Sequence, residues 1–334
     1  MSTLTLKTIA KAVTTAACSA ALFAASTAPA FAQEQVNVRF SWKLKGEYAA
    51  MYVAQEKGFY AREGLSVKLG EGAGSPAALG ALLQGQDDVV LLPAIFALTA
   101  ISKGMPIKII SLYHPQTPIA LISWPENPVK TPKDLEGKVI ATAIGETGTT
   151  YLESFCKNNG VDCSKVKKVQ VDAQSRVPLF VQHKVDVVSV YQTNDLPVLE
   201  EKQGAKFVVL EMDKNGLAVP GMSLVSSDAI IAKKPETLKK LLKAVGEGVD
   251  AMKKDPADAA NMLAKSWPGH PSITAVTTQV KATADAIPAS TGHPIGWIDE
   301  KVINEALQLL KSTGEIDAPK PTSTYYTNSL LGGK

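Results

Sequence analysis

The chain contains few of the residues and motifs from which metal centres and common catalytic sites are built. Among its 334 residues there are three cysteines and four histidines, and no G-x-S-x-G element, H-E-x-x-H pair or Gly-Lys-Ser/Thr phosphate loop occurs. The histidines have no ligand-like spacing to the cysteines. We therefore expect no metal ion, no cofactor and no enzymatic activity.

The chain also lacks an excess of either charge. Lysine and arginine number 35 and aspartate and glutamate 32, which gives a formal net charge of +3. This balance provides no basis for binding nucleic acid or an anionic membrane surface. After Ala32, no apolar run is long enough to cross a bilayer.

The N-terminus has the pattern of a secretory signal peptide. Lys7 and Lys11 precede an apolar stretch over about residues 12–25, Ala30-Phe31-Ala32 is an A-x-A cleavage site, and no acidic residue occurs before Glu34. We expect residues 1–32 to be removed by cleavage after Ala32. The mature protein is then periplasmic, with a formal charge of about +1 because two lysines are lost.

Two other interpretations of this segment are weaker. A retained membrane anchor is disfavoured because Thr14, Thr15 and Ser19 interrupt an apolar run that is already short. A lipoprotein anchored at Cys18 is disfavoured because Thr15 stands where an aliphatic residue is expected. Cleavage to a free exported protein is the expectation that remains.

Two cysteines, Cys156 and Cys163, remain in the mature chain. In an oxidising compartment they can form a local disulfide across the turn Asn158–Gly160. The alternative is two small buried thiols, which cysteine tolerates well. The sequence leaves both open.

Strand and helix patterns alternate along the mature chain, which is typical of an α/β fold. The continuous apolar runs VVLL and IKII fit parallel strands that are covered on both faces. The first part of the chain predicts strands at Val36–Phe40, Leu65–Leu69, Asp88–Leu92 and Ile107–Tyr113, and helices at Glu47–Lys57, Ser75–Gln84 and Ile95–Ser102.

A second lobe is predicted to begin after the proline-bracketed segment His114–Pro118. Its expected strands are Lys138–Ala143, Val166–Val171, Val185–Tyr191 and Lys206–Glu211, and its helices Thr147–Asn159, Arg176–Gln182 and Asp195–Gln203. The chain returns to the first lobe at Val219–Gly221, and its last third is mostly helical. We therefore predict a first lobe of residues 33–116 and 220–334 and a second lobe of residues 117–219, joined by a two-strand hinge.

One stretch, Ser41–Val67, resembles a known family. An early tryptophan, a helix ending in A-Q-E-K-G-F-Y and the run R-E-G-L-S-V follow in the order found in substrate-binding proteins of ABC importers for nitrate, sulfonates, taurine and pyrimidine precursors. The resemblance continues more loosely to the tail at Tyr325–Asn328. It implies a two-lobed, type II-like periplasmic binding protein, expected to be a monomer. Its partners would be a small solute and an ABC permease with its ATPase at the inner membrane.

Ligands of open α/β sheets lie outside the carboxyl ends of strands, which selects candidate residues in the first lobe. Trp42 ends the first strand and can stack on a flat ligand, or else pack in the core. Tyr48 has the same ambiguity, whereas Glu47 is expected to be a solvated carboxylate at a helix N-terminus. Ser75 can bind a ligand oxygen but is more simply explained as a helix N-cap. Pro93 ends the strand VVLL on the cleft side.

The remaining candidates come from the second lobe and the first crossing. The loop that begins at Gly145 opens a helix with threonine hydroxyls, although a carboxylate at Glu146 would repel an anion unless it points away. Tyr191 can stack opposite Trp42, while Asn194 and Asp195 can either accept hydrogen bonds from a ligand or cap a helix. The second-lobe candidates are Glu146, Thr147, Thr149, Tyr191, Asn194 and Asp195, and Tyr113 and His114 lie at the crossing.

These residues favour a flat, nitrogen-rich solute of the pyrimidine-precursor type over a sulfonate, taurine or nitrate. An exported enzyme is the alternative of another class, because fungal pyrimidine synthases resemble this fold. Those enzymes carry a cysteine-rich motif, however, which the two mature cysteines do not reproduce. An adhesion module would not be expected to contain a deep cleft.

Overall fold

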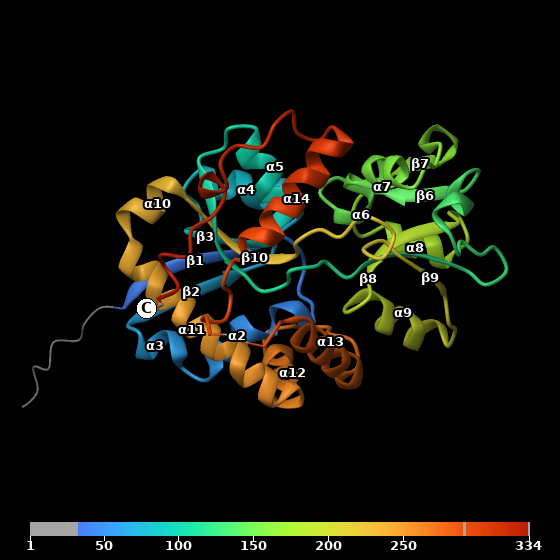
Figure 1. The fold of residues 1–334 in the computed structure, drawn as a ribbon. Helices are drawn as coiled ribbons and strands as arrows, with labels where there is room; N and C mark the ends of the chain where they lie inside the picture. The colour runs from blue at the N-terminus through green and yellow to red at the C-terminus, as the bar shows by residue number, and fades with distance from the viewer. Residues whose placement is uncertain (1–32, 290–291, 333–334) are drawn as a thin grey trace, which may run out of the picture.

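The protein, analysed as a computed structural model, forms two α/β lobes (Figure 1). The structure describes residues 33–289 and 292–332. The expected signal peptide and Cys18 lie outside these ranges. No helix within the described ranges is both long and apolar enough to span a membrane.

The first lobe is built on a five-stranded sheet with the order β2-β1-β3-β10-β4, in which β10 runs antiparallel to both neighbours. Every residue of VVLL is buried, as expected for a strand covered on both faces. The strands are β1 (Glu34–Phe40), β2 (Leu65–Gly70), β3 (Val89–Pro93), β4 (Ile107–Leu112) and β10 (Met222–Ser227).

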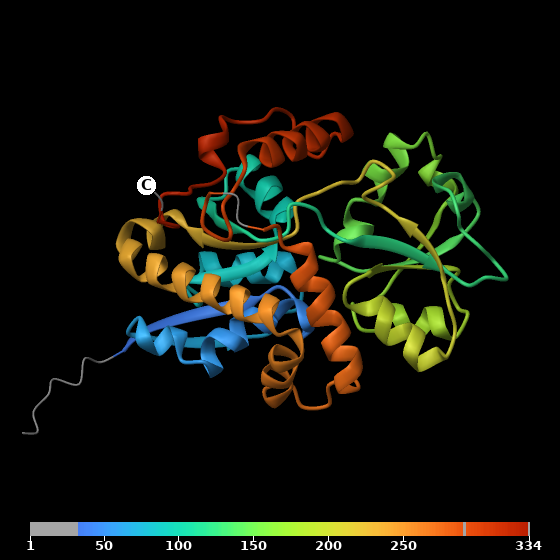
Figure 2. The same cartoon turned by 60° about the horizontal axis from the view of Figure 1, so that its bottom comes forward.

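Helices cover both faces of this sheet (Figures 1 and 2). On one face lie η1 (Gly46–Tyr48), α2 (Ala49–Glu56), α3 (Phe59–Arg62), α11 (Pro235–Lys254), α12 (Pro256–Lys265) and α13 (Ile273–Ala286). On the other face lie α4 (Ser75–Leu83), α5 (Ala94–Ser102) and α14 (Glu300–Thr313), with α10 (Asp228–Lys233) and η4 (Thr322–Thr324) at the periphery. The apolar stripe of α11, from Leu238 to Met252, is buried and packs on α2.

The second lobe contains a five-stranded sheet of order β7-β6-β8-β5-β9, in which β5 runs antiparallel to β8 and β9. The strands are β5 (Ile119–Ser123), β6 (Val139–Thr142), β7 (Lys167–Gln170), β8 (Val187–Tyr191) and β9 (Val208–Glu211). The helices are η2 (Pro132–Leu135), α6 (Thr147–Thr150), α7 (Leu152–Asn158), η3 (Cys163–Lys165), α8 (Arg176–Val181) and α9 (Asp195–Gln203).

The predicted elements differ from the structure in a few places. The helix expected over Thr147–Asn159 is divided into α6 and α7 at Tyr151, where φ is −103° and ψ is 22°. The helix expected from Glu47 begins as the 3-10 turn η1. Strand β5 and helices α10 and α13 were not predicted.

The chain passes between the sheets twice, after β4 and before β10. The two crossing segments lie side by side, because Thr117 donates to the carbonyl of Val219 and Gly221 to that of His114, both at 2.8 Å. This pairing forms the two-strand hinge. The exact lobe boundaries, after residues 116 and 219, remain a prediction.

The lobes also pack on each other away from the hinge. One apolar core runs continuously from α5 and α14 of the first lobe into α7 of the second. Phe96 of α5 contacts Tyr151 with ring centroids 5.5 Å apart, and Ser154 of α7 donates to Glu315 just beyond α14 at 3.1 Å. The lobes are therefore in contact through packed side chains as well as through the chain itself.

Cys156 and Cys163 form a disulfide whose Cα atoms are 5.6 Å apart. It joins the last turn of α7 to η3 and closes the turn at Asn158–Gly160. Of the two alternatives that the sequence left open, the structure has the disulfide.

Candidate functional site

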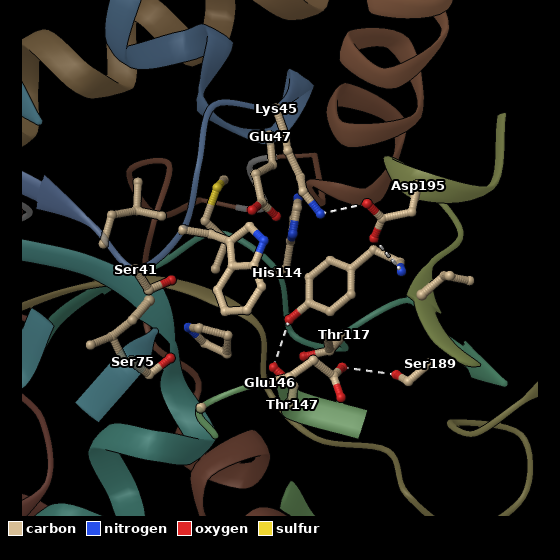
Figure 3. A pocket seen from close by; sticks show the side chains of 18 of the residues that line it. Ser41, Lys45, Glu47, Ser75, His114, Thr117, Glu146, Thr147, Ser189 and Asp195 are labelled. Atoms are coloured by element: carbon tan, nitrogen blue, oxygen red, sulfur yellow. Dashed lines mark hydrogen bonds and ion pairs between the residues drawn. The ribbon is translucent and has the colours of Figure 1, made fainter. Parts of the chain in front are cut away.

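A cavity lies between the two lobes, at the carboxyl ends of several strands (Figure 3). Its lining residues are Ser41, Trp42, Lys45, Glu47, Tyr48, Ser75, Leu91, Leu92, Pro93, His114, Thr117, Gly145, Glu146, Thr147, Arg176, Ser189, Val190, Tyr191, Asp195 and Met222.

Aromatic side chains form part of the first-lobe wall. Tyr48 is stacked on Phe40 with ring centroids 4.2 Å apart, so its ring is already occupied. Its hydroxyl is buried and has no hydrogen-bond partner among the described residues. No described ring stacks on Trp42, which lines the cavity and is only partly buried. Trp42 is thus an aromatic face available to a ligand.

Glu146 closes the helix terminus that would otherwise attract an anion. Its carboxylate accepts hydrogen bonds from the backbone N–H of Gly148 and Thr149, each at 2.9 Å, and from the hydroxyl of Ser189 at 2.8 Å. Burial raises the pKa of such a carboxyl, but nearby Arg176 and these hydrogen bonds outweigh burial and hold the pKa of Glu146 below its ordinary value. The N-terminus of α6 is therefore filled by its own side chain.

Arg176 is a buried cation that the sequence prediction missed as a site residue. Its Nη1 donates to the carbonyl of Ser189 at 2.7 Å, while its Nε–H has no partner among the described residues. A signal existed, because Arg176 is the first residue of α8, where the helix dipole disfavours a positive charge.

An ion pair joins the lobes at one side of the cavity. Lys45 Nζ lies 2.6 Å from the carboxylate of Asp195, which also accepts from the backbone N–H of Tyr191 at 3.1 Å (Figure 3). Burial acts against the charged carboxylate, but the Lys45 ammonium outweighs it and holds the pKa of Asp195 below its ordinary value. Tyr191 is fixed at its other end by Thr147, whose hydroxyl is 3.0 Å from the Tyr191 hydroxyl.

Next to this pair, Glu47 points into the cavity (Figure 3). It is partly buried, and one of its oxygens accepts a hydrogen bond from the side-chain amide of Asn194 at 3.3 Å. The expectation of a solvated carboxylate at a helix terminus is wrong, because η1 directs Glu47 towards the second lobe. Burial raises the pKa of Glu47, and Lys45 only partly offsets this effect.

Asn194 and Gln279 strengthen the same contact between lobes. Gln279 of α13 donates to the carbonyl of Asn194 at 2.7 Å and accepts from the backbone N–H of Gly46 at 3.0 Å. Helix α13, which the sequence did not predict, therefore contributes to the contact between the two lobes.

His114 lies at the hinge and lines the cavity. Its Nε2 is 3.3 Å from the carbonyl oxygen of Thr283. A carbonyl only accepts, so Nε2 carries the proton and Nδ1 is left as an acceptor. Burial lowers the pKa of His114 to about 4, although the bond to Thr283 opposes this. The imidazole is accordingly neutral at physiological pH.

Glycines permit the close contact at the other side of the cavity. A Cβ at Gly145 would lie 2.8 Å from Cδ of Pro76 and 3.3 Å from Cα of Gly74, both in the first lobe. Gly145 also has a φ of +75°, which disfavours any side chain. The two lobes can approach each other this closely only with glycine at position 145.

The cavity brings together nine of the candidate residues: Trp42, Tyr48, Ser75, Pro93, His114, Glu146, Thr147, Tyr191 and Asp195. Ser75 was expected to cap a helix, but the N-cap of α4 is Gly74, and Ser75 is already helical and buried beside the cavity. Asp195 makes no cap either, because its carboxylate pairs with Lys45.

Three candidates do not line the cavity. Tyr113 is buried in the first-lobe core. Thr149 turns its hydroxyl to Glu146 at 2.7 Å, and Asn194 uses its amide on Glu47. The Thr149 hydroxyl and the Asn194 amide nitrogen are thus bonded to other residues of the protein. No group of three or more His, Cys, Asp or Glu suited to a metal ion occurs among the described residues.

Two α/β lobes joined by a two-strand hinge, with a cavity between them, form the fold of periplasmic solute-binding proteins. The periplasmic aliphatic sulphonate binding protein SsuA from Escherichia coli has this fold. It aligns with a TM-score of 0.69 at 16% identity, over 89% of this chain and 99% of SsuA.

The chain belongs to the NMT1/THI5 like family, whose profile matches residues 45–259. It is 24% identical over 310 residues to the riboflavin-binding protein RibY of Chloroflexus aurantiacus, covering 90% of this chain and 87% of RibY. It is also 25% identical over 229 residues to the 4-amino-5-hydroxymethyl-2-methylpyrimidine phosphate synthase of Schizosaccharomyces pombe, covering 65% of each chain.

Proposed function

We propose that this protein is the solute-binding subunit of an ABC importer. It captures a flat, nitrogen-rich heterocycle of the pyrimidine-precursor type between its lobes and delivers it to a membrane permease. The observation that carries the proposal is a cavity lined from both lobes and closed by an ion pair between them. Hinge closure around a solute is the usual mechanism of periplasmic binding proteins.

Three features of the cavity support a heterocycle. Trp42 offers an unoccupied aromatic face, His114 Nδ1 offers a neutral acceptor, and Glu47 offers a carboxylate. A ring with several N–H groups and acceptors can satisfy all three. The helix terminus that would suit an anion is occupied by Glu146.

A sulfonate, taurine or nitrate is the second candidate. It is favoured by Arg176, whose buried Nε–H has no partner among the described residues. An enzyme is the third, since some relatives are named as pyrimidine phosphate synthases. We favour binding without turnover because neither a cysteine-rich motif nor another catalytic signature occurs in the sequence.

The proposal is tested by calorimetry on the purified mature protein. We expect 4-amino-5-hydroxymethyl-2-methylpyrimidine to bind and to be recovered unchanged, and taurine and nitrate not to bind. Trp42→Ala should weaken binding by about 1 kcal/mol or more through loss of the stacking face. Tight binding of taurine or nitrate alone would favour the second candidate, and chemical conversion of the pyrimidine would favour the third.

We also propose export by the N-terminal segment. Intact mass of the periplasmic form should place the mature N-terminus at Gln33. A lipid attached at Cys18 would contradict this.

A further inference from the structure

The charges that face the cavity do not balance. Two cations, Lys45 and Arg176, face three carboxylates, Glu47, Glu146 and Asp195. Asp195 is paired directly with Lys45. Glu146 is compensated by the N–H groups of α6, by Ser189 and by nearby Arg176. Since His114 is neutral, Glu47 is the carboxylate without a counter-ion of its own.

The immediate surroundings of Glu47 contain polar groups but no cation that pairs with it alone. Asn194 donates to Oε2 at 3.3 Å, and the Tyr48 hydroxyl lies next to the carboxylate. The other groups facing Glu47 are Lys45 and Asp195, which pair with each other, and the Tyr48 and Tyr191 hydroxyls. Tyr191 is bonded to Thr147, whereas the Tyr48 hydroxyl is buried without a partner. Glu47 therefore has an amide and a hydroxyl as neighbours on the cavity wall, but no cation of its own.

We propose that the cavity selects a solute with a cationic N–H edge, such as a protonated ring nitrogen beside an amino group, and that Glu47 is its counter-ion. The inference rests on the proposed solute-binding function and narrows its ligand class. A carboxylate matches two parallel N–H donors in an amidinium-like arrangement, and such charge-assisted pairs are stronger than neutral hydrogen bonds. A neutral solute leaves the partly buried charge of Glu47 uncompensated, and an anion opposes it.

Three probes of similar size and shape but different charge test whether the cavity selects its solute by charge. Benzamidine is cationic at neutral pH, benzamide is its neutral counterpart, and benzenesulfonate is anionic. Calorimetry on the wild-type protein should give at least tenfold tighter binding of benzamidine than of benzamide. The ratio should fall to about one in Glu47→Gln and be partly retained in Glu47→Asp. Glu56→Gln, which removes an exposed carboxylate of α2 outside the cavity, should leave the ratio unchanged.

A separate readout shows that Glu47→Gln is folded. Because burial raises the pKa of Glu47, its protonated form is stabilising at pH below about 4.5, and this stabilisation is lost as pH rises through the folded pKa. Glutamine keeps the shape without the charge. Glu47→Gln should therefore melt at a higher temperature than wild type at pH 8, with no difference at pH 4.

Two results overturn the inference while solute binding stands. One is equal or tighter binding of benzamide or benzenesulfonate by the wild-type protein. The other is mass spectrometry showing that the solute released from natively purified protein has no basic nitrogen. If the protein releases no solute and responds to none of these probes or to 4-amino-5-hydroxymethyl-2-methylpyrimidine, the inference and the proposed function both fail.

Discussion

Acidification should destabilise the unliganded protein through His114. The histidine is 3% exposed, and its ring Nε2 donates to the carbonyl of Thr283. Burial lowers its pKa from 6.5 to about 4, so the folded protein favours the neutral ring. This stabilisation is complete above pH 6.5 and is lost as pH falls from 6.5 towards 4.

The size of the effect follows from the two pKa values. With 6.5 in the unfolded chain and about 4 in the folded protein, the linkage relation gives a loss of roughly 2 kcal/mol in the free energy of unfolding between pH 7 and pH 5. Asp195 and Glu146 have lowered pKa values and contribute mainly at more acidic pH. Glu47 has a raised pKa and acts with the opposite sign, so the difference between wild type and a His114 variant isolates the contribution of the histidine.

Urea denaturation followed by tryptophan fluorescence measures this loss. His114→Gln keeps a donor for Thr283 and does not titrate, so it should lose roughly 2 kcal/mol less than wild type over the same interval. His270→Gln removes a histidine outside the cavity and is the matched control. If wild type and His114→Gln lose the same stability between pH 7 and pH 5, the reasoning about the buried neutral imidazole is wrong.

Three further changes have expected outcomes. Gly145→Ala adds a Cβ against Pro76 at an unfavourable φ, so solution scattering with saturating solute should show less compaction than wild type, and affinity should fall. Asp195→Asn removes the charge that pairs with Lys45 and should weaken solute binding by about 1.5–3 kcal/mol, an effect that a sulfonate would reverse. Cys156→Ala opens the disulfide loop and should reduce the free energy of unfolding by roughly 2–3 kcal/mol; an unchanged value under non-reducing conditions would contradict this.

Much of the fold could be predicted from local pattern. Buried strands such as Val89–Pro93 and the apolar stripe of α11 have clear periodicity. Helix α13 was not predicted because polar residues, Thr283 and Gln279, occupy buried positions and interrupt its apolar periodicity. Strand β5 was not predicted because its apolar run is short and directly follows the prolines of the crossing.

The candidate site likewise contains residues that the sequence could predict and residues that it could not. Residues at strand ends, such as Trp42 and Tyr191, were found because topology alone places them at the cleft. Lys45 was missed because its partner Asp195 is 150 residues away, and no local pattern encodes that distance. The role of Glu47 likewise depends on Asn194 in the other lobe.

The packing between lobes has a consequence for how affinity is set. Contacts of α14 with α7 and of α13 with α9 lie outside the cavity and favour the closed arrangement before any solute arrives. A solute's observed affinity scales with the fraction of molecules already competent to hold it. Weakening the Ser154–Glu315 contact should therefore lower affinity for every solute by one common factor. Substitutions in the contacts between lobes should therefore change affinity, whereas substitutions in the cavity should change which solute is bound.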